Sequence, residues 1–298
     1  MSYVGRFAPS PTGPLHVGSM LTALASFLEA RSRSGEWLVR IEDIDPPREL
    51  RGAASEILAT LERFGLEWDR SVLYQSTRLE EYEAVALALV ERGLAFRCSC
   101  TRAQLRELSP GTEDHRYPGT CRSRKRHRRA TAIRVRADAD TVEFSDRLQG
   151  RQCSRIRDES GDYVIFRRDG LPAYHLAVVL DDAAQDVTDV VRGIDLLEST
   201  ALHIHLQQTL ALRSPSYCHV PVIVNAQGQK LSKQTGALPV TAREPGPLAL
   251  ELLGYLGLTP PPSLQGAGVE ELWSWATHAW DIARLRGKTR LLQDTARP

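Results

Sequence analysis

The feature that most constrains the fold lies near the amino terminus, where a short strand, a Pro- and Gly-rich loop and a helix follow one another. Tyr3–Phe7 has the apolar content of a strand, and Leu21, Leu24 and Leu28 then recur at helical spacing. A second strand, Trp37–Ile41, comes after this helix. Because a strand–helix–strand order joins parallel strands, the segment predicts an α/β fold with a parallel sheet.

The loop between the first strand and the helix, APSPTGPLHVGS, suits a nucleotide. The first N–H groups of a helix lack partners within it and carry partial positive charge, so a helix that begins near Gly18 can bind phosphate. His16 can donate a hydrogen bond to a phosphate oxygen. A Pro-rich surface loop with an incidental histidine is the alternative. Neither GxxxxGK[ST] nor GxGxxG occurs, which excludes the Walker and dinucleotide-binding loops.

A second candidate phosphate-binding element is KLSKQ, in which Lys230 and Lys233 flank Ser232. Two of the four lysines of the chain lie in this stretch, after the turn Asn225–Gly228. Two ammonium groups on a loop can stabilise the charge of a transferring phosphoryl group. A solvated basic turn is the alternative, but the two elements together, in this order, are more specific than either alone.

Composition leaves a cytoplasmic enzyme as the expected class. The 298 residues suffice for about two domains, and no apolar run approaches a membrane span or a signal peptide. The net charge of +1 gives no global attraction to nucleic acid. Locally, Arg122–Arg136 is strongly basic and predicts either RNA-backbone contacts or an arginine-rich surface loop. Of the five cysteines, Cys153 and Cys218 are isolated and are expected to be core or inert.

The remaining cysteines form a candidate metal site. Cys98, Cys100 and Cys121 can supply three thiolates to a structural zinc, which normally takes four ligands. From chemistry alone the fourth ligand is His115 or His127. The alternative is three free buried thiols.

The rest of the chain is assigned by periodicity and turn signals. Helices are predicted at Ala53–Phe64, from Thr77 to Gly93 with a capping box formed by Thr77 and Glu80, and at Ser199–Leu212, Leu248–Leu256 and Val269–Leu285. Strands are predicted at Asp162–Arg167, Ala173–Leu180 and His219–Val224, and the tail Lys288–Pro298 is expected to be poorly ordered. The segment from about Phe96 to Arg157 has the pattern of an insertion.

Several of these segments together resemble class I aminoacyl-tRNA synthetases of the glutamyl branch. His16–Ser19 and KLSKQ are similar to the two signature sequences of that class, with Ser19, Leu231 and Gln234 as departures. Further segments resemble the glutamyl branch: Arg6–Gly13, Arg40–Pro46, Leu171–Ala177 and Val191–Asp195. The resemblance runs from about Arg6 to Gln234.

The resemblance implies a role for each matching residue. Glutamate contacts are implied for Arg6, Ala8, Ser10, Glu42, Tyr174 and Arg192. The implied ATP-binding residues are His16, Gly18 and Lys233, with Mg²⁺ on the phosphates, and the catalytic set adds Lys230 and Ser232. The chemistry agrees, because a guanidinium can bind a carboxylate through two parallel hydrogen bonds. Arg6 as a strand-edge charge and Arg192 as a surface partner of Asp189 are the alternatives.

The resemblance also bears on the metal and on the RNA. The pattern CxC…YxxxC of the shortened relatives implies Tyr117 as the fourth zinc ligand, beside Cys98, Cys100 and Cys121. Only about 64 residues follow Gln234, so no anticodon-binding domain is expected. The chain therefore resembles the glutamyl-Q tRNA(Asp) synthetases, which activate L-glutamate with ATP without tRNA. They then transfer the glutamate to queuosine at the wobble position of tRNA(Asp).

Two other functions remain open: a shortened glutamyl- or glutaminyl-tRNA synthetase that charges a 3′ end, and a non-catalytic RNA-binding paralogue. A monomer is expected. The expected fold is a Rossmann-like doubly wound parallel sheet with an inserted zinc-containing α+β subdomain and a short C-terminal helical region. The expected divisions are 1–95 and 186–240 for the two halves of the catalytic domain, 96–185 for the insertion and 241–298 for the C-terminal helices.

Overall fold

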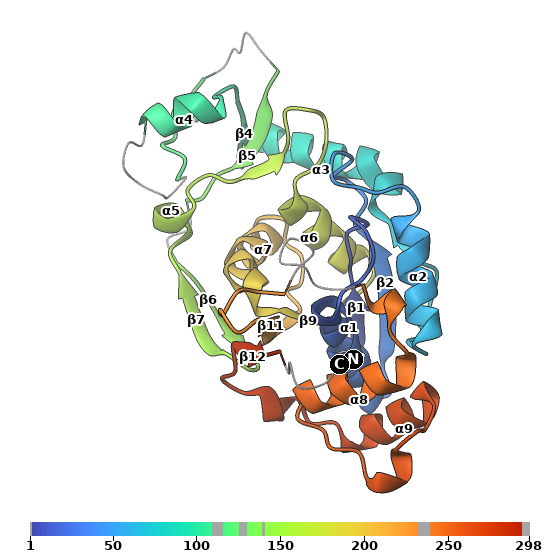
Figure 1. The fold of residues 1–298 in the computed structure, drawn as a ribbon. Helices are drawn as coiled ribbons and strands as arrows, with labels where there is room; N and C mark the ends of the chain where they lie inside the picture. The colour runs from blue at the N-terminus through green and yellow to red at the C-terminus, as the bar shows by residue number, and fades with distance from the viewer. Residues whose placement is uncertain (1, 109–115, 125–129, 139–140, 232–238, 294–298) are drawn as a thin grey trace.

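The computed structural model describes residues 2–108, 116–124, 130–138, 141–231 and 239–293 (Figure 1). Parallel strands form its centre. β1 (Val4–Phe7) pairs with β2 (Glu36–Ile41), and β2 pairs with β3 (Leu73–Tyr74), all in parallel. β9 (Asp189–Gly193) and β10 (Ser216–Val220) form a second parallel pair. Thr188 joins the two groups, because its N–H donates to the Val4 carbonyl at 2.9 Å. The predicted parallel sheet is confirmed.

Helix α1 (Val17–Ser32) is the centre of the hydrophobic core. Its residues Met20, Leu21, Leu24 and Leu28 are all at most 1% exposed, so the helix is covered on nearly every side. The C-terminal helices α8 (Pro245–Tyr255) and α9 (Val269–Ala279) pack against it (Figure 1). The large core that a chain of this length allows therefore lies directly behind the loop after β1.

The middle of the chain forms antiparallel structure apart from the parallel strands. β4 (Ala95–Cys98), β5 (Ala132–Val135) and β8 (Val164–Phe166) make one sheet, and β6 (Val142–Asp146) pairs with β7 (Gly150–Ser154). With α4 (Arg102–Leu108) and α5 (Ile156–Glu159), these strands extend along one side of the molecule (Figure 1). β4 to β7 lie within the segment expected to be an insertion, from about Phe96 to Arg157, and β8 extends the antiparallel sheet beyond it.

The remaining elements connect these parts. They are the helices α2 (Ala53–Arg63), α3 (Leu79–Glu91), α6 (Tyr174–Ala184) and α7 (Leu197–Thr209), the strands β11 (Val222–Val224) and β12 (Arg290–Leu292), and the 3-10 turns η1 (Gln75–Arg78), η2 (Ile194–Leu196), η4 (Val240–Ala242), η5 (Pro262–Leu264) and η6 (Ile282–Leu285).

The predicted strand at Ala173–Leu180 is wrong, because the structure has the helix α6 there. Residues 176–179 are all buried, so the segment is apolar on every side of the helix. A short continuous apolar run is equally compatible with a buried strand and a buried helix, and periodicity cannot separate the two. The predicted strand His219–Val224 is also divided, because Pro221 lies between β10 and β11 and has no N–H to donate.

Three further boundaries differ from the predictions. Thr77 lies in the 3-10 turn η1 and its hydroxyl donates to the Tyr74 carbonyl at 2.6 Å, so no capping box forms. The helix predicted at Val269–Leu285 ends at Ala279, where Trp280 has extended backbone angles. In the predicted disordered tail, residues 290–292 instead form β12, which pairs in parallel with β11; residues 294–298 lie outside the described residues.

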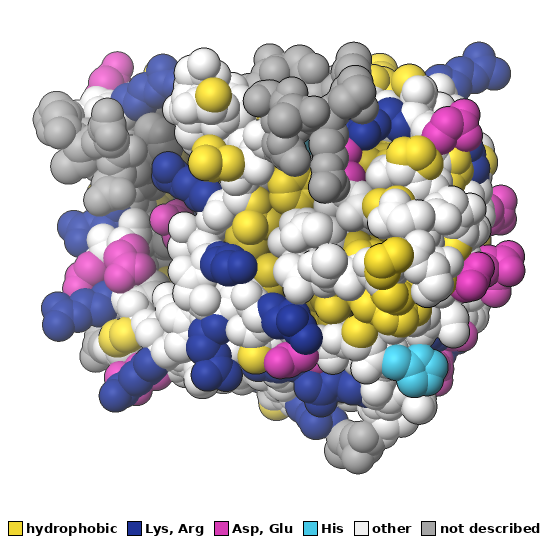
Figure 2. Space-filling view, turned by 60° about the horizontal axis from the view of Figure 1, so that its bottom comes forward, with side chains coloured by type: hydrophobic (Ala, Val, Ile, Leu, Met, Phe, Trp, Pro, Cys, Tyr) yellow, Lys and Arg dark blue, Asp and Glu magenta, His cyan; other side chains and the backbone are white. Residues whose placement is uncertain are grey.

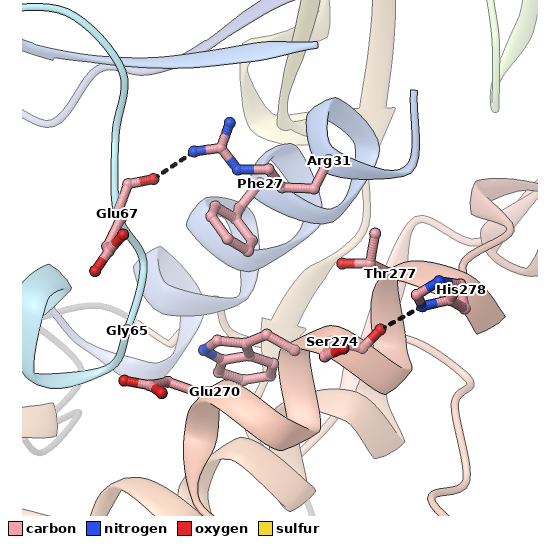
Figure 3. Close-up of a pocket in the computed structure, with 9 residues that line it drawn as sticks. Phe27, Arg31, Gly65, Glu67, Glu270, Ser274, Thr277 and His278 are labelled. Atoms are coloured by element: carbon pink, nitrogen blue, oxygen red, sulfur yellow. Dashed lines mark hydrogen bonds between the residues drawn. The ribbon is translucent and has the colours of Figure 1, made fainter. Parts of the chain in front are cut away.

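A surface groove of about 510 Å³ lies between α1, the loop after α2 and α9 (Figure 3). Its walls include Phe27 and Trp273, and across it the Arg31 guanidinium donates to the Glu67 carbonyl at 2.7 Å. None of the predicted site residues lines this groove. Among the described helices, none is long and apolar enough to cross a membrane.

Candidate functional site

The loop after β1 lies against the carboxyl end of β2. The Glu42 N–H donates to the Pro9 carbonyl at 3.0 Å, which holds the segment Ala8–Ser10 beside Glu42. Ala8 is half-buried and Ser10 is exposed, whereas Arg6, on β1, is only 4% exposed. Since ligands of open parallel sheets bind beyond the carboxyl ends of the strands, these residues stand where a substrate is expected.

Buried charges order this end of the sheet. The Arg6 guanidinium donates to both carboxylate oxygens of Asp182, at 3.1 and 3.5 Å. Arg40, fully buried on β2, lies 2.8 Å from Asp182 and 3.6 Å from the Glu42 carboxylate. Burial raises the pKa of Glu42 to about 7, although Arg40 and Arg6 lower it. Glu42 therefore titrates near neutral pH, at the place where the resemblance puts the α-amino group of glutamate.

Arg192, on β9, is a buried cation whose described hydrogen-bond partners are all neutral. Its Nη1 faces the Tyr174 hydroxyl at 3.4 Å and the His203 Nδ1 at 3.3 Å. Its Nη2 donates to Thr200 Oγ1 at 2.8 Å. Arg192 is 4% exposed, and it forms no ion pair with a carboxylate of the described residues. The alternative of a surface partner for Asp189 is therefore wrong, and the guanidinium is placed to receive an anion.

A carboxylate–histidine pair that sequence reasoning missed stands behind Arg192. The Arg192 Nε–H donates to His219 Nε2 at 3.0 Å, and His219 Nδ1 lies 2.7 Å from the Asp146 carboxylate. Burial and then Arg192 lower the pKa of His219, against the hydrogen bond with Asp146. The neutral imidazole therefore carries its proton on Nδ1 and accepts from Arg192. Asp146 lies in the insertion, 73 residues from His219, so no local pattern could reveal the pair.

The two signature segments meet at the start of α1. His16 is the N-cap of the helix, and its Nδ1 accepts from the Ser19 N–H at 3.2 Å. A Cβ atom on Gly18 would lie 3.2 Å from the His16 ring and 3.7 Å from the Leu231 carbonyl oxygen. Backbone atoms of the second signature therefore lie next to the first, and a side chain at position 18 would crowd the His16 ring.

The segment after the second signature is anchored at the same place. The Val240 N–H donates to the Leu15 carbonyl at 3.0 Å, and residues 16 and 239 form a β-bridge. Lys230 forms an ion pair with Asp195 at 2.6 Å. The predicted catalytic residues Ser232 and Lys233 lie outside the described residues. The described residues on either side of them, Leu231 and Pro239, both lie beside the residues that begin α1.

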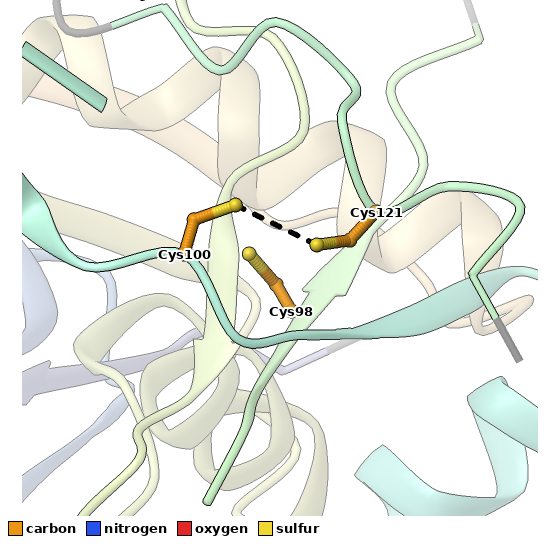
Figure 4. A group of neighbouring side chains, drawn as sticks. All are labelled: Cys98, Cys100 and Cys121. Atoms are coloured by element: carbon orange, nitrogen blue, oxygen red, sulfur yellow. Dashed lines mark hydrogen bonds between the residues drawn. The ribbon is translucent and has the colours of Figure 1, made fainter. Parts of the chain in front are cut away.

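The three predicted thiol ligands come together in the insertion (Figure 4). The sulfur atoms of Cys98, Cys100 and Cys121 all lie within 4.8 Å of one another, and the last two are 3.5 Å apart. The Tyr117 hydroxyl lies 3.4 Å from Cys98 Sγ and 3.8 Å from Cys100 Sγ. Three sulfurs and one phenol oxygen make a donor set of the size that a tetrahedral metal requires.

The two histidines that chemistry alone suggests as fourth ligand, His115 and His127, lie outside the described residues. Of the isolated cysteines, Cys218 is buried as expected, but Cys153 is exposed on β7 and does not belong to the core. It occupies an outward-facing position of a two-stranded sheet.

The described arginines of the basic run have internal partners. Arg122 pairs with Asp138 at 2.7 Å and with Asp162 at 2.5 Å. Arg134 covers the ring of Tyr117 at 4.1 Å, and Arg136 donates to the Gly93 carbonyl at 2.8 Å. These three side chains hold the insertion together, which argues against RNA contact as their main role.

The comparisons with known proteins agree with this geometry. Residues 3–258 match the family model described as tRNA synthetases class I (E and Q), catalytic domain. This match defines the class: the sheet and the paired signature segments are those of a class I synthetase catalytic domain.

Curated relatives indicate which branch of this synthetase class the chain is similar to. The chain is 51% identical over 282 residues to the glutamyl-Q tRNA(Asp) synthetase of Aromatoleum aromaticum, covering 94% of this chain and 89% of that protein. It is 50% identical to the protein of the same name from Ectopseudomonas mendocina, covering 95% of both. The chain belongs to the glutamyl-Q tRNA(Asp) synthetase family.

Among solved structures, the glutamate-tRNA synthetase of Elizabethkingia anophelis shares the fold. Its TM-score is 0.82 at 23% identity, and the match covers all of this chain and 69% of that one. A likeness at this level of identity concerns the fold alone.

Proposed function

We propose that this protein activates L-glutamate with ATP in the absence of tRNA and transfers the glutamyl group to queuosine at the wobble position of tRNA(Asp). In the first step an oxygen of the glutamate α-carboxylate attacks the α-phosphorus of ATP, and pyrophosphate leaves. In the second step a hydroxyl group of the RNA attacks the acyl carbon of the adenylate, and AMP leaves. Neither step requires a nucleophile from the protein.

The proposal rests on the buried guanidinium of Arg192, which has no carboxylate partner among the described residues. A buried charge is costly unless it is paired, and the described partners of Arg192 are neutral. A carboxylate from the substrate would complete the site, with Tyr174 beside it. Glu42 would receive the α-amino group, and Arg6, Ala8 and Ser10 would complete the glutamate contacts. The site would thus offer the Arg192 guanidinium to a carboxylate of glutamate and the Glu42 carboxylate to its ammonium group.

ATP would bind where the two signature segments meet. The first N–H groups of α1 and the His16 ring would face the phosphates, and Gly18 would leave room for them. Lys230, Ser232 and Lys233 would approach from the other side, on a segment anchored at Leu15. Mg²⁺ would enter with ATP, on its phosphates. Catalysis would then consist of positioning and charge stabilisation.

The thiol cluster fits one structural zinc ion, held by Cys98, Cys100, Cys121 and the Tyr117 hydroxyl. Burial raises the pKa of Cys121, but hydrogen bonds from Tyr117 and its neighbours bring it down to about 7, which favours a thiolate. The ion would tie β4 to the segment before β5, and so order the insertion.

The domain division that fits these roles is 1–95 and 186–240 for the catalytic halves, 96–185 for the zinc-containing insertion and 241–298 for the C-terminal helices. The protein would act in the cytoplasm, where its tRNA substrate is, and as a monomer.

The test of the first step is glutamate-dependent exchange of pyrophosphate into ATP without tRNA. We expect exchange with L-glutamate and none with L-glutamine or L-aspartate. Exchange that requires tRNA would instead indicate a shortened glutamyl-tRNA synthetase. No exchange under any condition would indicate a non-catalytic paralogue.

A further inference from the structure

Four exposed cations recur at every second position near the end of the described chain. They are Arg284, Arg286, Lys288 and Arg290, which we call the C-terminal basic strip. None of them forms an ion pair with another described residue, whereas neighbouring arginines do: Arg243 pairs with Glu251. Elsewhere in the described residues, Arg6, Arg122 and Arg147 each pair with a carboxylate.

The backbone of the strip is fixed to the rest of the fold. β12 pairs with β11 in parallel register, with Arg290 beside Val222. The Gly287 N–H donates to the Leu148 carbonyl at 3.1 Å, and the Gln149 side chain donates to the Lys288 carbonyl at 3.1 Å. Because the backbone is already ordered, the conformational entropy that the protein loses on binding a ligand here is confined to side chains.

A hollow of about 530 Å³ adjoins the strip and extends its positive surface. Arg286 lines it together with Arg33 and Arg147. The last two share the carboxylate of Glu29, at 2.8 and 2.5 Å, and Arg147 also lies 3.8 Å from the Asp189 carboxylate. The other acid of the hollow, Asp281, accepts from the Ala283 N–H. Figure 2, which turns the lower end of the molecule toward the viewer, shows Lys and Arg side chains gathered on this face.

The strip lies next to the second signature segment. β11, its partner strand, leads directly into the turn Asn225–Gly228 and then to Lys230. Arg290 Nη1 lies 3.8 Å from the position of a Cβ atom on Gly228. The strip therefore extends from the hollow beside the C-terminal end of α1, which Arg286 lines with Arg33, to the turn before Lys230, and its Arg290 end lies next to the second signature segment.

We propose that the C-terminal basic strip binds the sugar–phosphate backbone of the RNA that accepts glutamate. The inference rests on the proposed function for the identity of the RNA, but the strip itself is defined by charge and position alone. Guanidinium groups bind phosphate oxygens through paired hydrogen bonds, and backbone contacts position a nucleic acid without reading its sequence. The strip would thus hold the RNA while other contacts select the base.

The experiment compares the wild-type protein with a quadruple variant: Arg284→Gln, Arg286→Gln, Lys288→Gln and Arg290→Gln. Binding of tRNA is measured by filter retention over a range of salt concentrations. We expect the affinity to fall by about tenfold or more, and the slope of log K against log salt to become less steep by about one for each phosphate that the variant no longer neutralises. Exchange of pyrophosphate without tRNA should remain within about twofold of wild type, because the strip touches neither substrate of that step.

The matched control removes two exposed arginines elsewhere, Arg51→Gln with Arg92→Gln, and should leave RNA binding unchanged. If the quadruple variant melts at a lower temperature than the wild type, a double variant, Lys288→Gln with Arg290→Gln, is used instead. We expect it to lose RNA affinity by a smaller factor. Wild-type affinity and salt slope in both strip variants would overturn the proposal. So would a loss of binding to anionic phospholipid vesicles while tRNA binding stays intact. Failure of the exchange reaction in the wild type would reject the proposed function instead. The binding measurement would still test the strip, because it does not depend on the exchange reaction.

Discussion

The charge of Arg192 determines what the site can bind. Replacing it by Gln removes the cation and leaves an N–H donor on a shorter side chain. We expect the KM for glutamate to rise by about a hundredfold, because a hydrogen bond to a charged group contributes about 1.5–3 kcal/mol. The KM for ATP should change little. An unchanged KM for glutamate, measured by pyrophosphate exchange, would contradict the pocket assignment.

His219 and Asp146 are expected to act through Arg192 and not on the substrate. In His219→Leu the Arg192 Nε–H loses its acceptor, so the guanidinium is free to turn away from Tyr174. We predict a rise in the KM for glutamate of about tenfold, with the KM for ATP unchanged. His219→Gln, whose amide oxygen can accept the same hydrogen bond, should recover most of the loss. Equal losses in both variants, or a drop in thermal stability that explains them, would refute the positioning role.

The pKa of Glu42, raised by burial to about 7, gives the site a pH dependence. Below that pH the side chain is protonated and neutral, and above it the side chain is ionised and can bind an ammonium group. We therefore expect the KM for glutamate to rise by up to about tenfold for each pH unit below 7, and to level off above it. Glu42→Gln should bind glutamate weakly at every pH. A wild-type profile that is flat between about pH 6 and pH 8 would exclude this role.

Sequence reasoning located the separate residues of this site better than their connections. Arg6, Glu42 and Arg192 could be predicted from motifs. Each lies at or beside the carboxyl end of a parallel strand, where ligands of such sheets bind. The Asp146–His219 pair and the Arg40–Asp182 pair do not follow. Their members are 73 and about 142 residues apart and meet only through tertiary packing.

At the scale of elements, the close approach of α1 and the second signature segment is the sharpest feature. In Gly18→Ala the new methyl group would lie 3.2 Å from the His16 ring, in the space that the phosphates are proposed to use. We expect pyrophosphate exchange to fall by about ten- to a hundredfold, with little change in melting temperature, because an alanine favours the helix itself. Ser32→Ala, at an exposed position at the far end of the same helix, serves as the control. Full activity in Gly18→Ala would remove this contact from the ATP site.

The thiol cluster is predicted to hold one zinc ion per chain. In Cys121→Ser, metal analysis should find much less than one zinc ion per chain. The melting temperature should also fall, because the ion no longer links β4 to the segment before β5. Cys153→Ser, which removes an exposed thiol outside the cluster, should keep the metal. Wild-type protein that contains no zinc after purification without chelators would contradict the assignment.

The elements that sequence patterns misassigned share one cause. α6 is buried on all sides, and β10 and β11 are divided by Pro221 so that each pairs with a different neighbour. The surrounding core decides the first case, in which an apolar run fits a strand or a helix, and the second is decided by the missing N–H of Pro221. The three cysteines of the cluster could be predicted because thiols at this spacing are typical of a metal site, whereas Tyr117 followed only from the family resemblance.

For the molecule as a whole, Glu42 and Arg192 lie at the carboxyl ends of the parallel strands, and the C-terminal basic strip runs from the hollow beside the end of α1 to the turn that precedes Lys230. In the proposed function, activation of glutamate uses residues at the carboxyl ends of the parallel strands, supported by Asp146 of the insertion, and transfer to RNA needs a further surface. This separation is why the two steps can be measured independently.

The most direct test of the central claim is transfer of labelled glutamate to tRNA(Asp) prepared from cells that contain or lack queuosine. We predict label on the tRNA only when queuosine is present, at the wobble position, and stable to removal of the 3′-terminal adenosine. Label that is independent of queuosine, or that is lost with the 3′ end, would contradict the account.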